Sequence, residues 1–558
     1  MKNQMKRIFA AASAVLAALL MPDTGACRNT CPVVDVKNVC IPVLVGECSG
    51  PLAVLCIDNA SGEDLTLDGV TVAVSGLPEA AVKDVSLLYT GTMSPLHSET
   101  ESQAIKSVFA RCGGSQRIFS EPDYAMLQDR RKPGRDGTVF LGSGKRLVKG
   151  RNWFHVSLNL DGAGIPDLSA VCRLEVTEAR IDGSVAPLEQ EGPVDRRLAV
   201  GLRNHGDDGV FAYRIPGIAT TPQGTLIAVY DVRHYTTFDL QEDIDVGMSR
   251  STDGGRSWEK MRIIMDMGEW GGLPQAQNGI GDPAVLVDEA TGEIFVVAVW
   301  THGLGNGRAW NKVGDGFSPE ETAQLMIVSS KDDGRTWSEP RNITSQVKHR
   351  DWRFTLQGPG RGISMKDGTL VFPVQYVGPD MVPSAGIMYS RDHGRTWLCH
   401  GPARANTTES QVAEVSPGVL MLNMRNNLRT GRVVCTTSDF GRTWTEHSST
   451  GKLREPVCMA GLLHVPAEDN VLGKDILLFS NPDTEKGRSH ITVKASLDGG
   501  ETWLPENSLL LDEEEGWGYS CLTMIDRKTV GILYEGSVSQ IVFQAVDIGD
   551  IAGGGDGL

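Results

Sequence analysis

Three arginines are the residues with the clearest chemical potential in this sequence. Arg214 lies in the phrase YRIP at 213–216, Arg425 ends an apolar segment, and Arg488 precedes another. A guanidinium group binds a carboxylate through paired, charge-assisted hydrogen bonds, and does so better than a lysine. If the fold brings the three side chains together, they would bind a carboxylate. Taken singly, each arginine is better explained as a surface charge or a salt-bridge partner.

Five copies of one eight-residue phrase indicate the elements that would position these side chains. The phrase is S/T-x-D-x-G-x-S/T-W, and each copy follows a short apolar segment. Asp and Ser/Thr side chains hydrogen-bond backbone groups two residues on, Gly accepts a positive φ, and Trp supplies an apolar anchor. The phrase therefore predicts a tight turn, an Asp-box, within a hairpin. The copies span 251–258, 330–337, 390–397, 437–444 and 496–503.

The spacing of the boxes predicts the architecture that carries them. Successive copies begin 79, 60, 47 and 59 residues apart, and repeats of this length are typical of four-stranded propeller blades. Segments 225–231 and 529–535 also have the character of strands, which leaves room for one more blade closed from both ends of the repeat region. We predict an all-β protein with a six-bladed β-propeller over residues 195–558.

The region before the repeats has a different pattern. Residues 28–190 lack the box and alternate short apolar runs with glycines and polar turns. This pattern predicts an N-terminal β-sandwich, which we interpret as a possible carbohydrate-binding module. Segment 186–195 has the composition of a linker to the propeller.

The composition excludes some classes of function. The 558 residues carry a net charge of −17, which argues against nucleic-acid binding because that function requires a basic face. An anionic substrate is still possible, since a local arginine cluster can dominate one pocket. The histidines show no metal-ligand spacing and no H-E-x-x-H motif, so we predict neither a metal nor a cofactor.

The first 26 residues have the pattern of a secretory signal peptide. Basic residues precede an apolar stretch that is too short to be interpreted as a membrane span, and small residues follow it. We therefore expect a protein that is secreted, periplasmic or on the cell surface, with no membrane span. Cys27 loosely resembles a bacterial lipoprotein acceptor site, which makes a lipid anchor there an alternative.

Seven of the 11 cysteines lie before residue 173. In a secreted chain this clustering favours disulfides in the N-terminal region. The other four, which lie in apolar strand contexts, are expected to be buried thiols. They are Cys399, Cys435, Cys458 and Cys521.

Together these features resemble the exo-α-sialidases (neuraminidases). The resemblance rests on YRIP at 213–216, the five boxes, Glu409 within ESQVAE, Gly487-Arg488 and the phrase GYS at 518–520. It covers residues from about 200 to 545. The likeness is closest to secreted bacterial members that carry an extra N-terminal β domain.

The resemblance implies three catalytic residues. Tyr519 would be the nucleophile, Glu409 its general base, and Asp239 the acid/base catalyst. Sialidases depart from the usual two-carboxylate scheme of glycosidases by using a tyrosine nucleophile. The alternatives for the acid/base role lie in the same segment as Asp239, namely Glu242, Asp243 and Asp245.

The resemblance also implies the residues that bind substrate. The three arginines would grip the carboxylate of sialic acid, Arg233 would contact both Asp239 and substrate, and Asp282 would lie in the pocket around the N-acyl group. The function implied is a retaining exo-α-sialidase that hydrolyses terminal sialic acid from glycoproteins, glycolipids or oligosaccharides. The alternatives are a trans-sialidase, an intramolecular type that gives an anhydro product, and a non-catalytic glycan-binding propeller.

Overall fold

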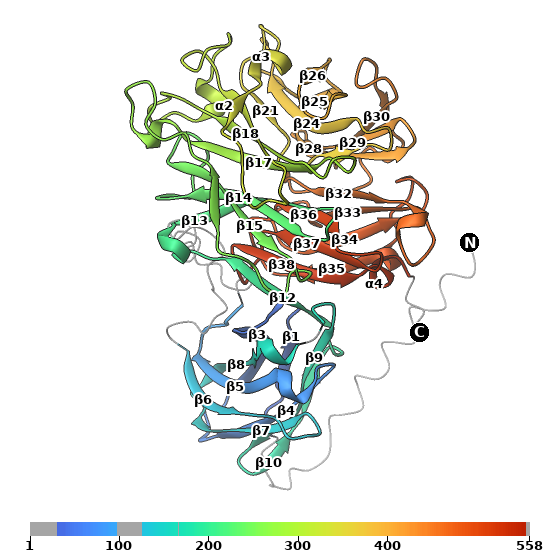
Figure 1. Cartoon of the computed structure of the whole chain (residues 1–558). Coiled ribbons are helices and arrows are strands. Elements are labelled where there is room, and N and C mark those ends of the chain that lie inside the picture. Colours follow the sequence, from blue (N-terminus) through green and yellow to red (C-terminus); the bar gives the residue numbers. More distant parts are fainter. Residues whose placement is uncertain (1–30, 97–124, 166, 554–558) are drawn as a thin grey trace, which may run out of the picture.

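The computed structural model describes residues 31–96, 125–165 and 167–553. The predicted signal peptide and Cys27 lie outside these ranges. The described part is built almost entirely of strands, in a smaller body that contains β1 to β10 and a larger one that follows it in the chain (Figure 1). None of its helices combines the length and the apolar character needed to cross a membrane.

The smaller body contains two facing sets of strands. The first is a sheet in the order β11-β1-β3-β8-β5-β6, and the second joins β9 to β4, β7 and the short β10. Alternation of apolar and polar residues in β9 buries one face of that strand, as expected for a sheet with one solvated side. The strands are β1 (Val34–Asn38), β3 (Cys48–Asn59), β4 (Thr66–Ser75), β5 (Val82–Gly91), β6 (Met126–Arg131), β7 (Thr138–Arg146), β8 (Gly150–Leu160), β9 (Val171–Ile181), β10 (Ser184–Ala186) and β11 (Leu188–Gln190).

The segment expected to be a linker takes part in the sheets. β11 lies within it and pairs in parallel with β1. The next strand, β12 (Arg196–Arg203), pairs with β9 at its start and with β38 (Ile541–Asp547) at its end. One strand therefore belongs to a sheet that runs from the smaller body into the larger one.

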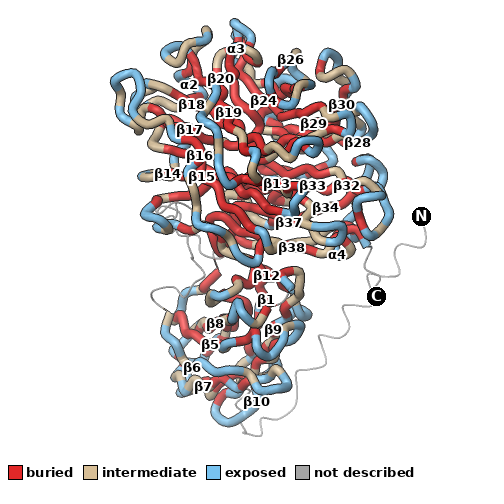
Figure 2. The backbone as a smooth tube through the Cα atoms, viewed as in Figure 1, coloured by how far each residue is buried: buried red, intermediate tan, exposed pale blue. Residues whose placement is uncertain are grey.

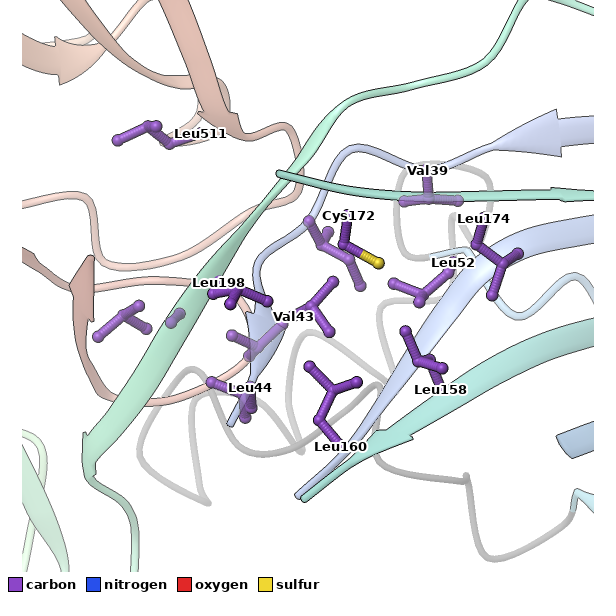
Figure 3. Close-up of a cluster of buried hydrophobic side chains, with 14 of the residues drawn as sticks. Val39, Val43, Leu44, Leu52, Leu158, Leu160, Cys172, Leu174, Leu198 and Leu511 are labelled. Atoms are coloured by element: carbon purple, nitrogen blue, oxygen red, sulfur yellow. The ribbon is translucent and has the colours of Figure 1, made fainter. Parts of the chain in front are cut away.

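The two bodies share one hydrophobic core at this junction. Leu198 of β12 and Leu511 of the larger body belong to the same buried cluster as Leu52 and Leu158 of the smaller body (Figure 3). The buried Arg196 side chain donates to the backbone carbonyl of Leu52 and to three others. The junction is thus packed and hydrogen-bonded, and not a flexible tether.

The larger body is a series of mainly antiparallel sheets. The first three contain β13 (Ala212–Thr220), β14 (Leu226–Arg233), β15 (Ile244–Ser251) and β16 (Arg262–Met265); then β17 (Ile280–Val287), β18 (Ile294–Trp300), β19 (Gln324–Ser330), β20 (Arg341–Asn342) and β22 (Gly360–Arg361); then β21 (Thr355–Gln357), β23 (Ile363–Ser364), β24 (Leu370–Val377), β25 (Pro383–Ser390), β26 (Leu398–Cys399) and β27 (Arg404–Ala405). Their central strands are almost continuously apolar and buried (Figure 2).

The next two sheets have four strands each, and the last is completed by β12. They contain β28 (Thr407–Ser416), β29 (Val419–Asn426), β30 (Val433–Thr437) and β31 (Thr445–Glu446); then β32 (Gly461–Val465), β33 (Ile476–Pro482), β34 (Ile491–Ser496) and β35 (Ser508–Asp512); then β36 (Ser520–Met524), β37 (Thr529–Tyr534) and β38. β12 pairs in parallel with β2 (Val43–Leu44) and antiparallel with β38. A strand from the start of the larger body thus pairs with one near its end.

Helices are few and short in the described residues. The α-helices are α2 (Ala309–Lys312), α3 (Thr344–Val347) and α4 (Ile548–Ala552). The 3-10 helices are Glu79–Ala81, Gly162–Gly164, Asp207–Gly209, Gln275–Gln277, Ala467–Asp469 and Pro505–Asn507.

All five repeated phrases form the same hydrogen-bonded turn. The first Ser or Thr hydroxyl accepts the Gly N–H at 2.9–3.0 Å. One oxygen of the Asp accepts the N–H of the later Ser or Thr at 2.8–2.9 Å, and the other oxygen accepts its hydroxyl at 2.6–2.7 Å. These bonds reach four residues along the chain, because two consecutive residues with positive φ curl the backbone back on itself. In three of the turns the first hydroxyl also accepts the N–H two residues on, at 3.3–3.5 Å, as expected.

The glycine of the turn is needed for space as well as for its backbone angle. At Gly255 a Cβ would lie 2.0 Å from the ring of Phe543 in β38, and at Gly394 it would lie 2.6 Å from the ring of Phe295 in β18. Each turn therefore packs closely against the preceding sheet. For the first turn the neighbour is the last sheet of the chain.

Some cysteines of the smaller body do not form the disulfides that we expected from the sequence. Cys40 and Cys172 are buried free thiols, and burial, as the largest cause, raises the pKa of each to about 12. They pack in the core as small apolar groups. In the larger body Cys435, Cys458 and Cys521 are buried thiols, as expected, and Cys399 is half-buried. Cys112 lies outside the described residues.

Candidate active site

Most of the predicted site residues line a single cavity of about 340 Å³ in the larger body. The three arginines enter it from three different sheets, because Arg214 lies in β13, Arg425 in β29 and Arg488 in the connection between β33 and β34. Residues separated by as many as 305 positions thus face one space. The lining is Arg214, Asp239, Trp310, Pro383, Thr408, Glu409, Arg425, Asn427, Arg488, Trp517 and Tyr519.

Arg214 is held in place by a buried carboxylate. Its Nε and Nη2 donate to the two oxygens of Glu535 at 2.7 and 3.3 Å. The same carboxylate accepts the backbone N–H groups of Ile215 at 2.9 Å and Tyr519 at 3.0 Å. The guanidinium carbon also lies 3.9 Å from the centre of the Trp517 ring, a cation–π contact. Glu535 thereby fixes Arg214 and the backbone at Tyr519 together.

Arg425, Glu409 and Tyr519 form a connected trio. The Tyr519 hydroxyl donates to Glu409 Oε1 in a short hydrogen bond. Arg425 Nη1 donates to Glu409 Oε2 at 2.5 Å and to the Tyr519 oxygen at 3.0 Å. A phenol therefore has a proton acceptor on one side and a cation on the other, which are the partners an oxygen nucleophile needs.

Arg488 is oriented by the backbone. Its Nη1 donates to the Trp517 carbonyl at 2.9 Å and its Nη2 to the Val457 carbonyl at 3.4 Å. The guanidinium carbon lies 5.5 Å from the centre of the Tyr519 ring. Since its hydrogen-bond partners are neutral carbonyls, Arg488 forms no ion pair within the part of the chain that the structure describes.

The environment of Tyr519 keeps its phenol protonated in the free protein. The side chain is only 6% exposed. Burial and the negative charge of Glu409 raise the pKa of Tyr519 well above its ordinary value, and the opposing charges of Arg425 and Arg488 do not cancel this shift. A reaction that used this phenol oxygen as a nucleophile would have to remove its proton, and Glu409 is already bonded to it.

Asp239 lies at the open side of the cavity. Its side chain is 70% exposed, and one carboxylate oxygen accepts from Arg233 Nη1 at 3.0 Å. Desolvation in the pocket raises the pKa of Asp239, but the positive charges of Arg233 and Arg214 outweigh that effect and hold the pKa below its ordinary value. The free protein therefore carries Asp239 as a carboxylate at neutral pH.

Arg233 and Asp282 lie behind the cavity wall and do not line the cavity. The Arg233 side chain is 2% exposed and donates to Asp231, to Asp239 and to the Thr237 carbonyl. Asp282 is half-buried and its backbone N–H donates to Asp231 at 2.8 Å. Burial and the nearby charges of Asp231 and Asp239 raise the pKa of Asp282 well above its ordinary value.

Several contributors to the site were not predicted from the sequence, among them Glu535 and two tryptophans. Glu535 ends the segment 529–535, which we expected only as a strand. The one sequence signal for its role was the position of a glutamate directly after an apolar strand. Trp517 lines the cavity from the loop before β36, and Trp310 lines it from α2. Trp517 stands two residues before Tyr519, whereas no sequence signal marked Trp310.

One group of possible metal ligands occurs in the described residues, next to the Asp239 segment. Ligand atoms of His234, Asp243 and Asp245 all lie within 4.8 Å of one another. His234 Nε2 and an Asp245 oxygen are 2.8 Å apart, a hydrogen-bonded pair. This hydrogen bond accounts for two of the three members of the group.

Comparison with known proteins identifies the family. Residues 33–184 match the family described as the N-terminal domain of BNR-repeat neuraminidase, and residues 224–532 match the BNR repeat-like domain. A sialidase of Bacteroides fragilis is 48% identical over 521 residues, which is 92% of this chain and 95% of that protein. The chain belongs to the sialidase family. It is a glycoside hydrolase, and its fold is the β-propeller of sialidases.

Other relatives of this sialidase agree. A sialidase of Micromonospora viridifaciens is 31% identical over 60% of this chain and 51% of that protein. The solved structure of the Hadza microbial sialidase Hz136 superposes with a TM-score of 0.86 and 50% identity, over 93% of this chain and 100% of that one. A Trypanosoma rangeli sialidase with 2,3-difluorosialic acid, a covalent intermediate, has a TM-score of 0.53 and 20% identity, over 63% of this chain and 58% of that one; this likeness concerns the fold alone.

Proposed function

We propose that this sialidase hydrolyses terminal α-linked sialic acid from glycoproteins, glycolipids or oligosaccharides, with retention of configuration and with Tyr519 as nucleophile. The observation that carries the proposal is the cavity that joins three arginines to a phenol bonded to a glutamate. The names of the relatives, which are sialidases, support the substrate.

The arginines fit the carboxylate of the sugar. Arg488 forms no ion pair among the described residues, whereas Arg214 and Arg425 each have one carboxylate partner. Guanidinium groups bind a carboxylate through charge-assisted and often paired hydrogen bonds. We propose that the three groups hold the sugar so that its anomeric carbon faces the Tyr519 oxygen.

A phenol suits this substrate better than a carboxylate nucleophile. The anomeric carbon of sialic acid carries the carboxylate, so an anionic nucleophile would approach against like charge. In the first step the Tyr519 oxygen bonds to the anomeric carbon, its proton moves to Glu409, and the glycosidic C–O bond breaks. Asp239 gives its proton to the leaving oxygen.

The second step reverses these proton transfers. Water loses a proton to Asp239 and its oxygen bonds to the anomeric carbon, while the Tyr519 oxygen leaves and recovers its proton from Glu409. Two inversions give net retention of configuration.

Substrate binding prepares Asp239 for its role as an acid. In the free protein the charges of Arg233 and Arg214 hold its pKa low. When a substrate carboxylate pairs with Arg214, part of that positive charge is offset, so the pKa of Asp239 rises toward the range in which it can donate a proton.

We also propose that the larger body is a closed six-bladed propeller. Successive sheets contact one another in turn through β13, β17, β23, β28, β32 and β36, and β36 contacts β13. The pairing of β12 with β38 and the packing of Gly255 on Phe543 support the same closure. We further propose that residues 1–26 direct secretion, with lipidation of Cys27 as the alternative to a free protein, and that the smaller body binds glycans and positions the enzyme.

The test is incubation with α2,3- and α2,6-sialyllactose, with the products followed by NMR. The proposal predicts free sialic acid whose first-formed anomer is α, which then equilibrates. The β anomer as first product would contradict retention. Sialic acid transferred to lactose would indicate a trans-sialidase, and an anhydro product would indicate intramolecular attack. Binding without any product would indicate a glycan-binding propeller.

A further inference from the structure

The backbone at Asp239 is held by a residue from the neighbouring sheet. Asp239 lies in the connection between β14 and β15, and Arg308 lies in the connection between β18 and β19. Arg308 Nη1 donates to the Asp239 carbonyl oxygen at 2.9 Å. The guanidinium carbon of Arg308 lies 4.2 Å from the centre of the Phe238 ring. Arg308 therefore contacts two consecutive residues of the Asp239 segment.

A second contact supports the same segment from α2. The Ala309 N–H donates to the Leu240 carbonyl at 3.0 Å. Leu240 and Ala309 are buried in one small cluster with Val299 and Val313. The residues on either side of Asp239 are thus fixed to the β18–β19 connection, one by a cation–π contact and one by packing and a backbone hydrogen bond.

The Asp239 segment has little other support on its open side. The side chain of Asp239 is 70% exposed and Phe238 is 53% exposed. Within the described residues the carboxylate itself accepts one hydrogen bond, from Arg233. A carboxyl group that transfers a proton must stay within hydrogen-bond reach of the leaving oxygen. In such an exposed segment, the contact from Arg308 limits the movement of the backbone that carries the carboxyl group.

We propose that Arg308 is a positioning residue that aligns Asp239 with the leaving oxygen. The inference rests on the proposed role of Asp239 as acid/base catalyst. Arg308 acts through the main chain of Asp239 and does not touch the reacting atoms. Its positive charge adds to those of Arg233 and Arg214 at the carboxyl group.

The proposal makes the importance of Arg308 depend on the leaving group. A sugar alkoxide is a poor leaving group and needs the proton, whereas an activated aryl oxide leaves with little assistance. Arg308→Ala should lower kcat/KM for 3′-sialyllactose by about 10- to 100-fold, a part of the usual contribution of general acid catalysis. The same variant should lower kcat/KM for 4-nitrophenyl sialoside by less than about threefold, because the aryl oxide can leave with little proton donation from the general acid.

Two further variants isolate the cause. Arg308→Lys keeps the charge and one donor, and should recover most of the sialyllactose activity. Lys312→Ala removes an exposed charge from α2 and should leave both substrates unchanged. If Arg308→Ala does not fold, Arg308→Gln, which keeps a donor without the charge, should show the same substrate dependence.

The outcomes separate this inference from the proposed function. Equal losses for the two substrates in the Arg308 variants, with Asp239→Asn losing sialyllactose activity selectively, would overturn the positioning role and leave the acid role intact. If Asp239→Asn itself shows no dependence on the leaving group, then the acid role in the proposed function fails. The proposal predicts that the Arg308 variants and Asp239→Asn both lose activity selectively toward sialyllactose.

Discussion

The two ends of the same sheets are stabilised in different ways. At one end, each Asp-box carboxylate is bonded within its own eight residues, over a separation of four positions. At the other end, the pocket is built from contacts between distant segments. Arg214 and Glu535 are 321 positions apart, Tyr519 and Glu409 are 110 apart, and Arg425 and Tyr519 are 94 apart.

Because of this difference, stability and activity should depend on different sets of residues. A box turn needs only its own sequence and a neighbour to pack against. The pocket needs several sheets to be correctly placed before any of its charges are paired. Variants at the pocket end should therefore change activity, and those at the box end should change stability alone.

Glu535→Gln should have the largest effect, because Glu535 contributes both to the stability of the fold and to the placement of Arg214 and Tyr519 in the pocket. It is fully buried and pairs with Arg214, which is 4% exposed. Loss of one partner of a buried ion pair costs about 3–5 kcal/mol of unfolding free energy. We expect a loss of this size in urea denaturation, together with a large fall in kcat/KM. Glu515→Gln, an exposed neighbour, is the control, and equal stability of the two variants would contradict the account.

A smaller, purely functional effect is expected for Arg488→Lys. Lysine keeps the charge but not the planar fork, and hydrogen bonds to charged groups contribute roughly 1.5–3 kcal/mol. KM for sialyllactose should therefore rise about 10- to 100-fold while the thermal midpoint changes little. Lys486→Ala, an exposed residue of the same connection, is the control. A fall in stability that matches the fall in affinity would make Arg488 structural.

The smallest effect is expected at the box end, for Asp392→Ala. Burial raises the pKa of Asp392, but hydrogen bonds from Thr396 and Ser390 outweigh it, so the folded-state pKa is below the ordinary value. This carboxylate therefore stabilises the fold above the unfolded pKa of about 3.9, and its contribution is lost as the pH falls through the folded pKa.

The measurement is calorimetry at several pH values. The thermal midpoint of Asp392→Ala should be about 2–4 °C lower than that of the unaltered protein at neutral pH, and the difference should shrink below about pH 4. The kcat/KM of the folded variant should be unchanged. An altered kcat/KM would contradict this distinction, because it would show that a change at the box end affects the pocket.

The sequence predicted local features well because their partners are local. The Ser, Asp and Gly of each box determine one turn, and the bonds of these turns reach two or four residues along the chain. The pairing of Tyr519 with Glu409 has no such local code, and only the family resemblance brought the two together. Arg233 was likewise expected to contact Asp239, and the structure places the two 3.0 Å apart.

What the sequence did not predict depends on long-range packing. The role of Glu535 was not predicted, because it lies in an ordinary strand segment and its partner, Arg214, is distant in the sequence. Asp282 was expected in the substrate pocket, but the structure places it outside the set of residues that line the cavity. The expected linker contains β11, because an edge strand can be recognised only with its partner.

The most direct test of the account is to identify the residue that becomes attached to the sugar. Incubation with 2,3-difluorosialic acid should form an adduct that breaks down slowly, since fluorine next to the anomeric carbon disfavours the oxocarbenium-like state of the second step. Mass spectrometry of the digested protein should find the sugar on Tyr519 and should find no adduct in Tyr519→Phe. A sugar attached to Glu409 or Asp239, or unchanged labelling of Tyr519→Phe, would contradict the role of the phenol.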